Sequence, residues 1–185
     1  MLKIKFQPFP IIKTPRLILR RLKLTDAPEF YFLRSDKKVL RYIDRAPAKS
    51  VAATKKFMKN LFKLEKKNEA INWAITLKGD DQLKGYVCIF NIKKEHHRAE
   101  LGYILHPSAQ GRGIANEAVK AVLKIAFSKF KLHSIEANIN PKNKASIKLI
   151  KRVGFKKEAH FKENYFSNGK FLDSVIYSKL APKKR

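Results

Sequence analysis

A glycine-containing segment in the middle of the chain has the residue types of an anion-binding loop. Gly111, Gly113 and Ala115 follow a strand-like stretch and directly precede a helical one. Small residues here leave backbone amides unobstructed at a helix N-terminus, where free N–H groups and the helix dipole attract negative charge. The dinucleotide spacing G-x-G-x-x-G and the P-loop ending Gly-Lys-Ser/Thr are both absent. Most glycine-rich turns only connect two elements, so the segment is either a plain strand-to-helix turn or an anion site of another kind.

Other polar residues have the types needed for proton transfer. Glu100 begins a strand-like stretch, and Asn143 and Ser146 stand three residues apart at the start of a predicted helix. Asn or Ser before an apolar run is also the pattern of an ordinary helix cap. The pair His96-His97 is a second possible base, although histidines beside Lys93-Lys94 are typical of an exposed loop.

The remaining histidines and the cysteine predict neither a metal site nor a reactive thiol. The spacing of His106, His133 and His160 does not suggest a set of ligands, so we expect no metal. Cys88, the only cysteine, lies in a predicted strand and is expected in the core. A single cysteine excludes a disulfide framework and fits a reducing compartment.

The elements that must position these residues form a mixed pattern of strands and helices. Alternating or β-branched apolar residues predict strands at 16–20, 72–77, 83–92, 99–105 and 133–139, and two more after residue 155 that turn at Asn168-Gly169. A turn is expected over residues 78–81. Helical spacing predicts helices opened by Thr25-Asp26 and by Ser50, then over 116–130 and from about Lys144 to Gly154. This order favours a three-layer α/β or α+β domain.

Composition limits the class of protein more than its activity. The 185 residues carry 42 Lys+Arg against 15 Asp+Glu, a net charge of +27, yet 44% are hydrophobic, which is enough for a core. The two halves of the chain carry nearly equal charge, as a lysine-rich solvated surface does, and attraction to an acidic partner is the alternative. No apolar stretch is long enough for a membrane span, and Lys3, Lys5 and Lys13 interrupt the region of a signal peptide. We expect a cytoplasmic protein with no membrane partner.

Short motifs along the chain resemble the GNAT superfamily of N-acetyltransferases. The acetyl-CoA loop of that superfamily reads Q/R-x-x-G-x-G/A, which Gln110-x-x-Gly113-x-Ala115 matches. The other motifs follow in order: Thr14–Arg20, Glu100–Tyr103, Asn116–Ala118, Asn140–Ser146, Val153–Phe155 and Gly169…Asp173…Tyr177. Together they resemble the ribosomal-protein alanine acetyltransferase (RimJ/RimL-type) branch over nearly the whole chain, although that branch usually has Trp where Gln110 stands.

The resemblance implies a fold as well as an activity. We expect one N-acetyltransferase domain over residues 1–185, with the GNAT fold. Its centre is a mixed, mostly antiparallel sheet of about seven strands, flanked by helices. A splayed strand pair in that sheet holds acetyl-CoA, the expected cosubstrate.

By resemblance, acetyl-CoA contacts one continuous stretch and one helix start. The backbone of Ile104, Leu105 and His106 pairs with the pantetheine arm, and Asn143 hydrogen-bonds it. The pyrophosphate binds the loop formed by Gln110, Gly111, Arg112, Gly113, Ile114 and Ala115. The physics agrees, because a peptide-like arm suits an open strand edge and a diphosphate suits a helix N-terminus. The Arg112 side chain either contacts phosphate or is simply exposed.

The same resemblance assigns the proton transfers of a direct-transfer mechanism. Glu100 is the expected general base, acting through a water, and Ser146 the expected acid for the leaving thiolate. Tyr103 or Tyr165 is the alternative to Ser146 as the acid. The alternative role for Glu100 is a structural ion pair with Arg98 or a lysine. An acetyl-cysteine at Cys88 would need an adjacent base, which the sequence does not indicate.

By resemblance, the acceptor is a primary amine, namely the N-terminal α-amine of an acidic, ribosomal protein. The enzyme is expected to be a monomer or a homodimer, and to associate with the ribosome. Acetylation of a polyamine or aminoglycoside is a rival, as is a non-catalytic RNA- or ribosome-binding role. The basic stretch 142–157 is either a solvated face or a site for the CoA 3′-phosphate or an acidic substrate.

Overall fold

The computed structural model describes residues 2–167 and 169–182, which form an eight-stranded mixed sheet. In sheet order the strands are β1 (Ile12–Lys13), β2 (Leu17–Arg21), β3 (Ile71–Leu77), β4 (Asp80–Lys93), β5 (Arg98–Leu105), β6 (Ser134–Ile139), β8 (Lys170–Leu180) and β7 (Lys156–Ser167). Neighbours are antiparallel except β5 and β6. The predicted sheet type is confirmed, and the extra strand is β1, which is too short to show a period.

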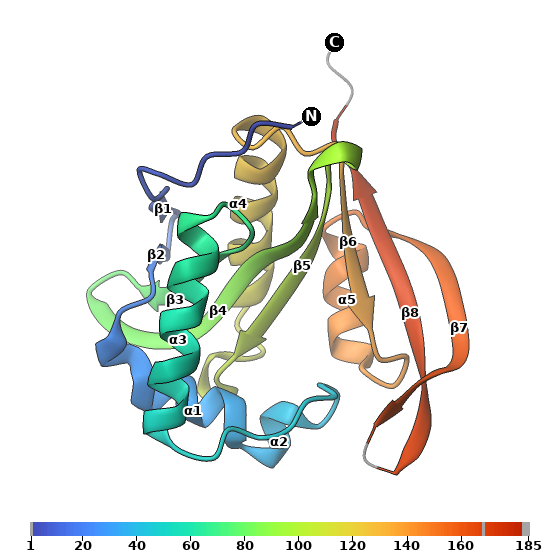
Figure 1. The fold of residues 1–185 in the computed structure, drawn as a ribbon, viewed down its shortest axis with the longest axis horizontal. Coiled ribbons are helices and arrows are strands. Elements are labelled where there is room, and N and C mark those ends of the chain that lie inside the picture. Colours follow the sequence, from blue (N-terminus) through green and yellow to red (C-terminus); the bar gives the residue numbers. More distant parts are fainter. Residues whose placement is uncertain (1, 168, 183–185) are drawn as a thin grey trace.

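Helices cover both faces of this sheet (Figure 1). They are α1 (Ala27–Ser35), α2 (Lys37–Leu40), α3 (Val51–Lys66), α4 (Ile114–Ser128) and α5 (Lys144–Arg152). Helices α1 and α3 lie on one face, and α4 lies on the other. The short α2, which Asp36 caps, was not predicted because four residues are too few for a helical pattern.

The two predicted N-caps have different outcomes. Ser50 caps α3 as expected, because its hydroxyl accepts a hydrogen bond from the Ala53 amide at 3.0 Å. Thr25-Asp26 does precede a helix, since α1 begins at Ala27 with Asp26 at its N-cap position, but the Asp26 side chain makes no cap bond to it. Instead Asp26 forms a buried bidentate ion pair with Arg20, at 2.7 and 2.8 Å. A charged partner within reach competes successfully with a weaker capping bond.

The sheet separates two hydrophobic cores. The larger contains residues of α4 and α5, such as Val122 and Ile150, packed on strand residues such as Trp73. The smaller contains Phe30 of α1 and Met58 of α3. The two faces of the sheet are therefore packed independently.

The ladder between β5 and β6 is incomplete. Only residues 98–100 of β5 pair with residues 134–136 of β6. Beyond Glu100 the two strands diverge (Figure 1), so residues 101–105 do not pair with β6, although β4 pairs with them on the other side. This is the predicted splayed strand pair.

The hairpin turns agree with the predicted pattern where they are described. Lys78 and Gly79 join β3 to β4, and Gly79 has a φ of +81°, which glycine adopts without strain. The turn predicted at Asn168-Gly169 falls between β7 and β8, and Asn168 lies outside the described residues. Among the described residues, no helix is long and apolar enough to cross a membrane.

Candidate functional site

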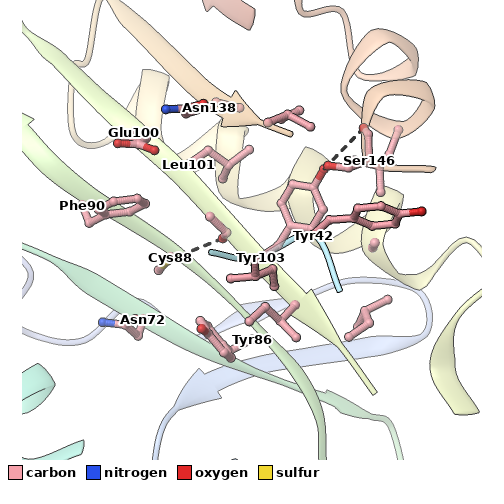
Figure 2. Close-up of a pocket in the computed structure, with 18 of the residues that line it drawn as sticks. Tyr42, Asn72, Tyr86, Cys88, Phe90, Glu100, Leu101, Tyr103, Asn138 and Ser146 are labelled. Carbon is pink, nitrogen blue, oxygen red and sulfur yellow. Dashed lines mark hydrogen bonds between the residues drawn. The ribbon is translucent and has the colours of Figure 1, made fainter. Parts of the chain in front are cut away.

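A cavity of about 1880 Å³ follows the divergence of β5 and β6. Ten of the twelve residues predicted for the site line it, all except His106 and Arg112. Figure 2 shows part of this lining, with Glu100, Tyr103 and Ser146 among the residues around the space. The volume exceeds the several hundred Å³ of a typical small-ligand pocket, so it has room for two substrates.

The glycine loop has the conformation that its residues predict. Gly111 and Gly113 have φ values of +73° and +74°, which favour glycine. Gly113 is the N-cap of α4 and has no side chain to occupy the first amides of the helix. A Cβ at Gly111 would meet nothing within 4 Å, so the loop faces open space. The amides of the first turn are thus available to an anion.

A carboxylate on the first turn of α4 holds the N-terminal segment against this loop. Glu117 accepts hydrogen bonds from the Thr14 hydroxyl at 2.6 Å, the Arg16 amide at 3.0 Å and the Arg16 Nε at 2.6 Å. Arg16 in turn donates Nη1 to the Arg112 carbonyl at 2.8 Å. The Arg112 side chain is exposed. These bonds explain why motifs a hundred residues apart belong to one site.

Some backbone groups at the end of β5 already have hydrogen-bond partners within the chain. The Gln110 side-chain amide donates to the Leu105 carbonyl at 3.2 Å. His106 donates its amide to the Lys84 carbonyl at 2.8 Å, and its carbonyl accepts from the Ala109 amide at 2.9 Å. Hydrogen-bonded pairs alternate along an antiparallel ladder, so Ile104, opposite Tyr86, directs its backbone groups to β4 as His106 does. The backbone groups of Tyr103 and Leu105 therefore face the open edge that would receive a peptide-like arm.

Residues of β5 alternate between the two faces of the sheet. Glu100, Gly102 and Ile104 pair with Phe90, Cys88 and Tyr86, so they share the face that α1 and α3 cover. Tyr103 and Leu105 project to the α4 face. The open gap connects the two sides, so groups on opposite faces can act on one bound pair of substrates.

In the part of the chain that the structure describes, the Glu100 carboxylate has no cationic side chain within 4.0 Å. Arg98 pairs instead with Glu136, at 2.7 Å, so the predicted ion-pair alternative does not form. The Asn91 side-chain amide donates to Glu100 at 2.9 Å. Burial raises the pKa of Glu100 above the ordinary value, and the hydrogen bond from Asn91 opposes this only in part. A raised carboxyl pKa is typical of a general base.

Tyr103 and Ser146 form a hydroxyl pair on the other side of the gap. Their oxygens are 2.6 Å apart (Figure 2). Asn143 caps α5 by accepting from the Ser146 amide at 3.1 Å. Burial raises the pKa of Tyr103 to about 12, so its phenol keeps its proton at neutral pH. Tyr165, the other candidate acid, donates its hydroxyl to Asp44.

The other candidate groups lack either the position or the protonation state for this chemistry. Neither His96 nor His97 lines the cavity. Burial raises the pKa of the Cys88 thiol to about 12, so it stays protonated. Within residues 2–167 and 169–182, no cluster of three or more His, Cys, Asp or Glu side chains has the arrangement of a metal site.

Sequence reasoning gave no role to two cavity residues, Asn91 and Asn116, and missed one contact beside the glycine loop. Asn91 lies where the register of β4 with β5 shifts, and its φ of +47° could not be predicted from the neighbouring residues. The Asn116 carboxamide oxygen is buried without a hydrogen-bond partner among the described residues. Glu117 and Arg16 belonged to recognised motifs, but their contact joins positions 101 residues apart. Such contacts follow from the fold and have no local signal.

The chain matches a family model and a curated relative over most of its length. Residues 16–156 match the model of the acetyltransferase (GNAT) domain. An uncharacterized N-acetyltransferase, p20 of Bacillus licheniformis, is 33% identical over 168 residues, which are 90% of this chain and 94% of the relative.

Solved structures have the same fold. The ribosomal-protein-S5-alanine acetyltransferase from Vibrio fischeri superposes with a TM-score of 0.83 at 28% identity, covering 93% of this chain and 97% of that chain. The spermidine N-acetyltransferase from Vibrio cholerae, solved in complex with CoA and spermine, gives a TM-score of 0.81 at 24% identity, covering 91% and 97%. The two have different acceptors.

The Glu117 contacts predict how the glycine loop is stabilised. Glu117→Gln should lower the free energy of unfolding by about 1.5–3 kcal/mol, because the hydrogen bonds lose their charged acceptor. Amides 110–113 should exchange faster in hydrogen-exchange mass spectrometry.

Hydrogen bonds from Thr14 and Arg16 outweigh burial and lower the pKa of Glu117. The contribution of Glu117 to the free energy of unfolding is therefore present above the ordinary carboxyl pKa and is lost as pH falls through the lowered value. The control is Glu95→Gln, an exposed carboxylate. Unchanged exchange at 110–113 would contradict the assignment.

Proposed function

Since the chain belongs to the acetyltransferase (GNAT) family, it is an acetyl-transferring enzyme, and we propose that it transfers acetyl from acetyl-CoA to the N-terminal α-amine of a protein. The proposal includes a single catalytic domain over the chain, a cytoplasmic location and an acidic, ribosomal acceptor. The observation that carries the catalytic part is the placement of an unpaired carboxylate and a hydroxyl pair on the two faces of the β5–β6 gap.

The residues of the loop and the gap fit acetyl-CoA. The free amides at the start of α4 suit its pyrophosphate, and the unpaired edge of β5 suits its amide-containing arm. Asn116 also lines the cavity, and its buried carboxamide oxygen has no hydrogen-bond partner among the described residues. Lys148 and Arg152 of α5 also line the cavity and offer charge to phosphate. When bound, acetyl-CoA supplies the acetyl group as an electrophilic thioester.

Glu100 removes the proton from the acceptor amine. Four residues, or about 13 Å, separate it along the strand from Ile104, near which the thioester carbonyl is expected, so a chain of waters must relay the proton. An α-amine with a pKa of about 7.7–8.0 is roughly one part in seven neutral at pH 7, whereas a lysine amine is about one part in 2,500. A relayed carboxylate is therefore sufficient for an N-terminal acceptor.

The Tyr103–Ser146 pair supplies the proton to the leaving sulfur. The amine nitrogen forms a bond to the acetyl carbon as the carbon–sulfur bond breaks, and the amine proton passes to Glu100. Ser146 protonates the thiolate and is reprotonated by Tyr103, whose hydroxyl is within hydrogen-bond distance. Tyr103 then regains its proton from solvent, and Glu100 releases the amine proton to solvent, so one proton is taken up and one is given off in each turnover.

A spermidine-type acceptor is the second candidate, because the V. cholerae relative acts on spermidine. The net charge of +27 opposes it, since a positive field repels a polycation and attracts an acidic protein. Membership of the family and the names of its relatives support catalysis over a non-catalytic binding role.

Replacing the base should change the pH profile as well as the rate. Glu100→Gln should lower kcat by about 10²–10⁴-fold. In the native enzyme, kcat should fall as pH drops through the raised pKa of Glu100, because only the ionised carboxylate accepts a proton. The variant should lack that acid limb. Glu163→Gln, which changes an exposed carboxylate outside the cavity, is the matched control. An unchanged acid limb in Glu100→Gln would show that another group is the base.

The hydroxyl pair should act as a unit. Ser146→Ala and Tyr103→Phe should each lower kcat by at least about tenfold, and the double variant should be no worse than the poorer single variant. The KM for acetyl-CoA should change little. Tyr165→Phe tests the other candidate acid, since it removes only the contact with Asp44. If Tyr165→Phe alone lowers kcat, the acid is Tyr165.

The acceptor can be identified directly. The protein is incubated with labelled acetyl-CoA and host lysate, and labelled species are analysed by mass spectrometry for the acetylated nitrogen. We expect label at protein N-termini and none on polyamines added at equal concentration. Predominant labelling of spermidine would favour the second candidate, and labelling of lysine side chains alone would exclude both.

A further inference from the structure

Two arginines at the acceptor side of the cavity have no carboxylate partner. Arg34 of α1 and Arg45 of the segment between α2 and α3 both line the cavity and are half-buried. Among the described residues, no Asp or Glu oxygen lies within 4.0 Å of either guanidinium. Partly buried arginines normally have such a partner, because an uncompensated charge is costly to bury.

The surrounding residues hold the two guanidinium groups in place. Arg34 lies over the Phe57 ring, 3.8 Å from its centroid, and Arg45 donates Nη1 to the buried Tyr86 hydroxyl at 3.4 Å. The segment carrying Arg45 is tied to α1 by a bond of 2.8 Å from the Ala48 amide to the Arg34 carbonyl. The side chains are therefore positioned before any ligand binds.

The nearest carboxylate in sequence is occupied elsewhere. Asp44 accepts a hydrogen bond from the Tyr165 hydroxyl on β7. Burial lowers the pKa of Arg34, and the charge of Arg45 lowers it further. An anion between the two arginines would relieve both effects.

The position of the pair indicates which substrate it contacts. Tyr86 pairs with Ile104 across β4 and β5, so it lies one strand away, at about 4.8 Å, from the expected thioester. It projects from the face that α1 and α3 cover, whereas the glycine loop leads into α4 on the opposite face. The phosphates of CoA are expected at that loop, which leaves the arginines to the acceptor.

We propose that Arg34 and Arg45 form a carboxylate-binding subsite, so that preferred acceptors carry a carboxylate close to the reacting amine. The inference rests on the proposed acetylation of an amine in this cavity and adds the chemistry that the site recognises. The planar fork of arginine suits a carboxylate, which accepts two parallel hydrogen bonds. The carboxylate belongs to an Asp or Glu side chain near a protein N-terminus, or to a free amino acid.

The test compares acidic acceptors with isosteric neutral ones. Hexapeptides that begin with Ala carry a single Asp at position 2, 3 or 4, or Asn at the same position, and free aspartate is compared with asparagine. Values of kcat/KM are measured with acetyl-CoA, and Kd is measured by calorimetry with CoA present. The full-length enzyme should favour Asp over Asn by at least about tenfold at one position or in the free amino acid.

Variants assign this preference to the arginines. Arg45→Gln should abolish it while leaving values for the Asn peptides nearly unchanged. Arg34→Met keeps an unbranched side chain over Phe57 and should act in the same way if Arg45→Gln folds poorly. The control is Lys49→Gln, which removes one positive charge from an exposed residue outside the cavity. It should keep the full preference for Asp.

The outcomes separate this inference from the proposed function. Loss of Asp-dependent binding in Arg45→Gln, without acetyl transfer by any enzyme form, would support the subsite and contradict the proposed N-terminal acetylation. Acetyl transfer without a preference for any acidic acceptor would overturn the subsite and leave the proposed function standing. A preference that survives in both arginine variants, or no binding of any acidic acceptor, would also overturn it.

Discussion

The interrupted ladder between β5 and β6 is the constraint on which the rest of the structure depends. Backbone amides and carbonyls in the middle of a sheet need partners, yet beyond Glu100 those of β5 have none from β6. One of these backbone groups, the Leu105 carbonyl, accepts a hydrogen bond from the Gln110 side chain. The rest require a ligand with the hydrogen-bonding groups of a peptide. The gap therefore suits an amide-containing ligand, and the free amides of the loop at the end of β5 suit a phosphate, as the proposed binding of acetyl-CoA requires.

The gap also determines how a reaction is divided between the two faces of the sheet. Glu100 and Tyr86 project toward α1 and α3, while Tyr103 projects toward α4 and meets Ser146 of α5. The proposed proton acceptor and the proposed proton donor thus lie on opposite faces of β5. Their pKa values are raised by the same cause, burial, with opposite uses: one carboxylate becomes a better base, and one phenol keeps its proton. A continuous sheet would prevent both groups from acting on one substrate pair.

Sequence reasoning succeeded where the controlling physics is local. The Gly111 and Gly113 conformations, the Ser50 cap and the strand periods depend on neighbouring residues, so they were predictable. It failed at Asp26, where a buried partner outweighed capping. Glu117 with Arg16, Asn91 with Glu100, and the unpartnered Arg34 and Arg45 depend on chain segments that only the fold brings together or keeps apart. The motifs identified the family because their residues and order match its patterns, but they did not indicate what each residue contacts.

The separation of the two hydrophobic cores has an evolutionary consequence. The loop and its Glu117 contacts belong to the α4 side, while Arg34, Arg45 and Tyr86 belong to the side of α1 and α3. Substitutions that share no contacts have nearly additive effects on stability. Residues on the side of α1 and α3, where the acceptor is proposed to bind, can therefore change between lineages without destabilising the glycine loop on the α4 side. Relatives with one fold and different acceptors are what such modular divergence produces.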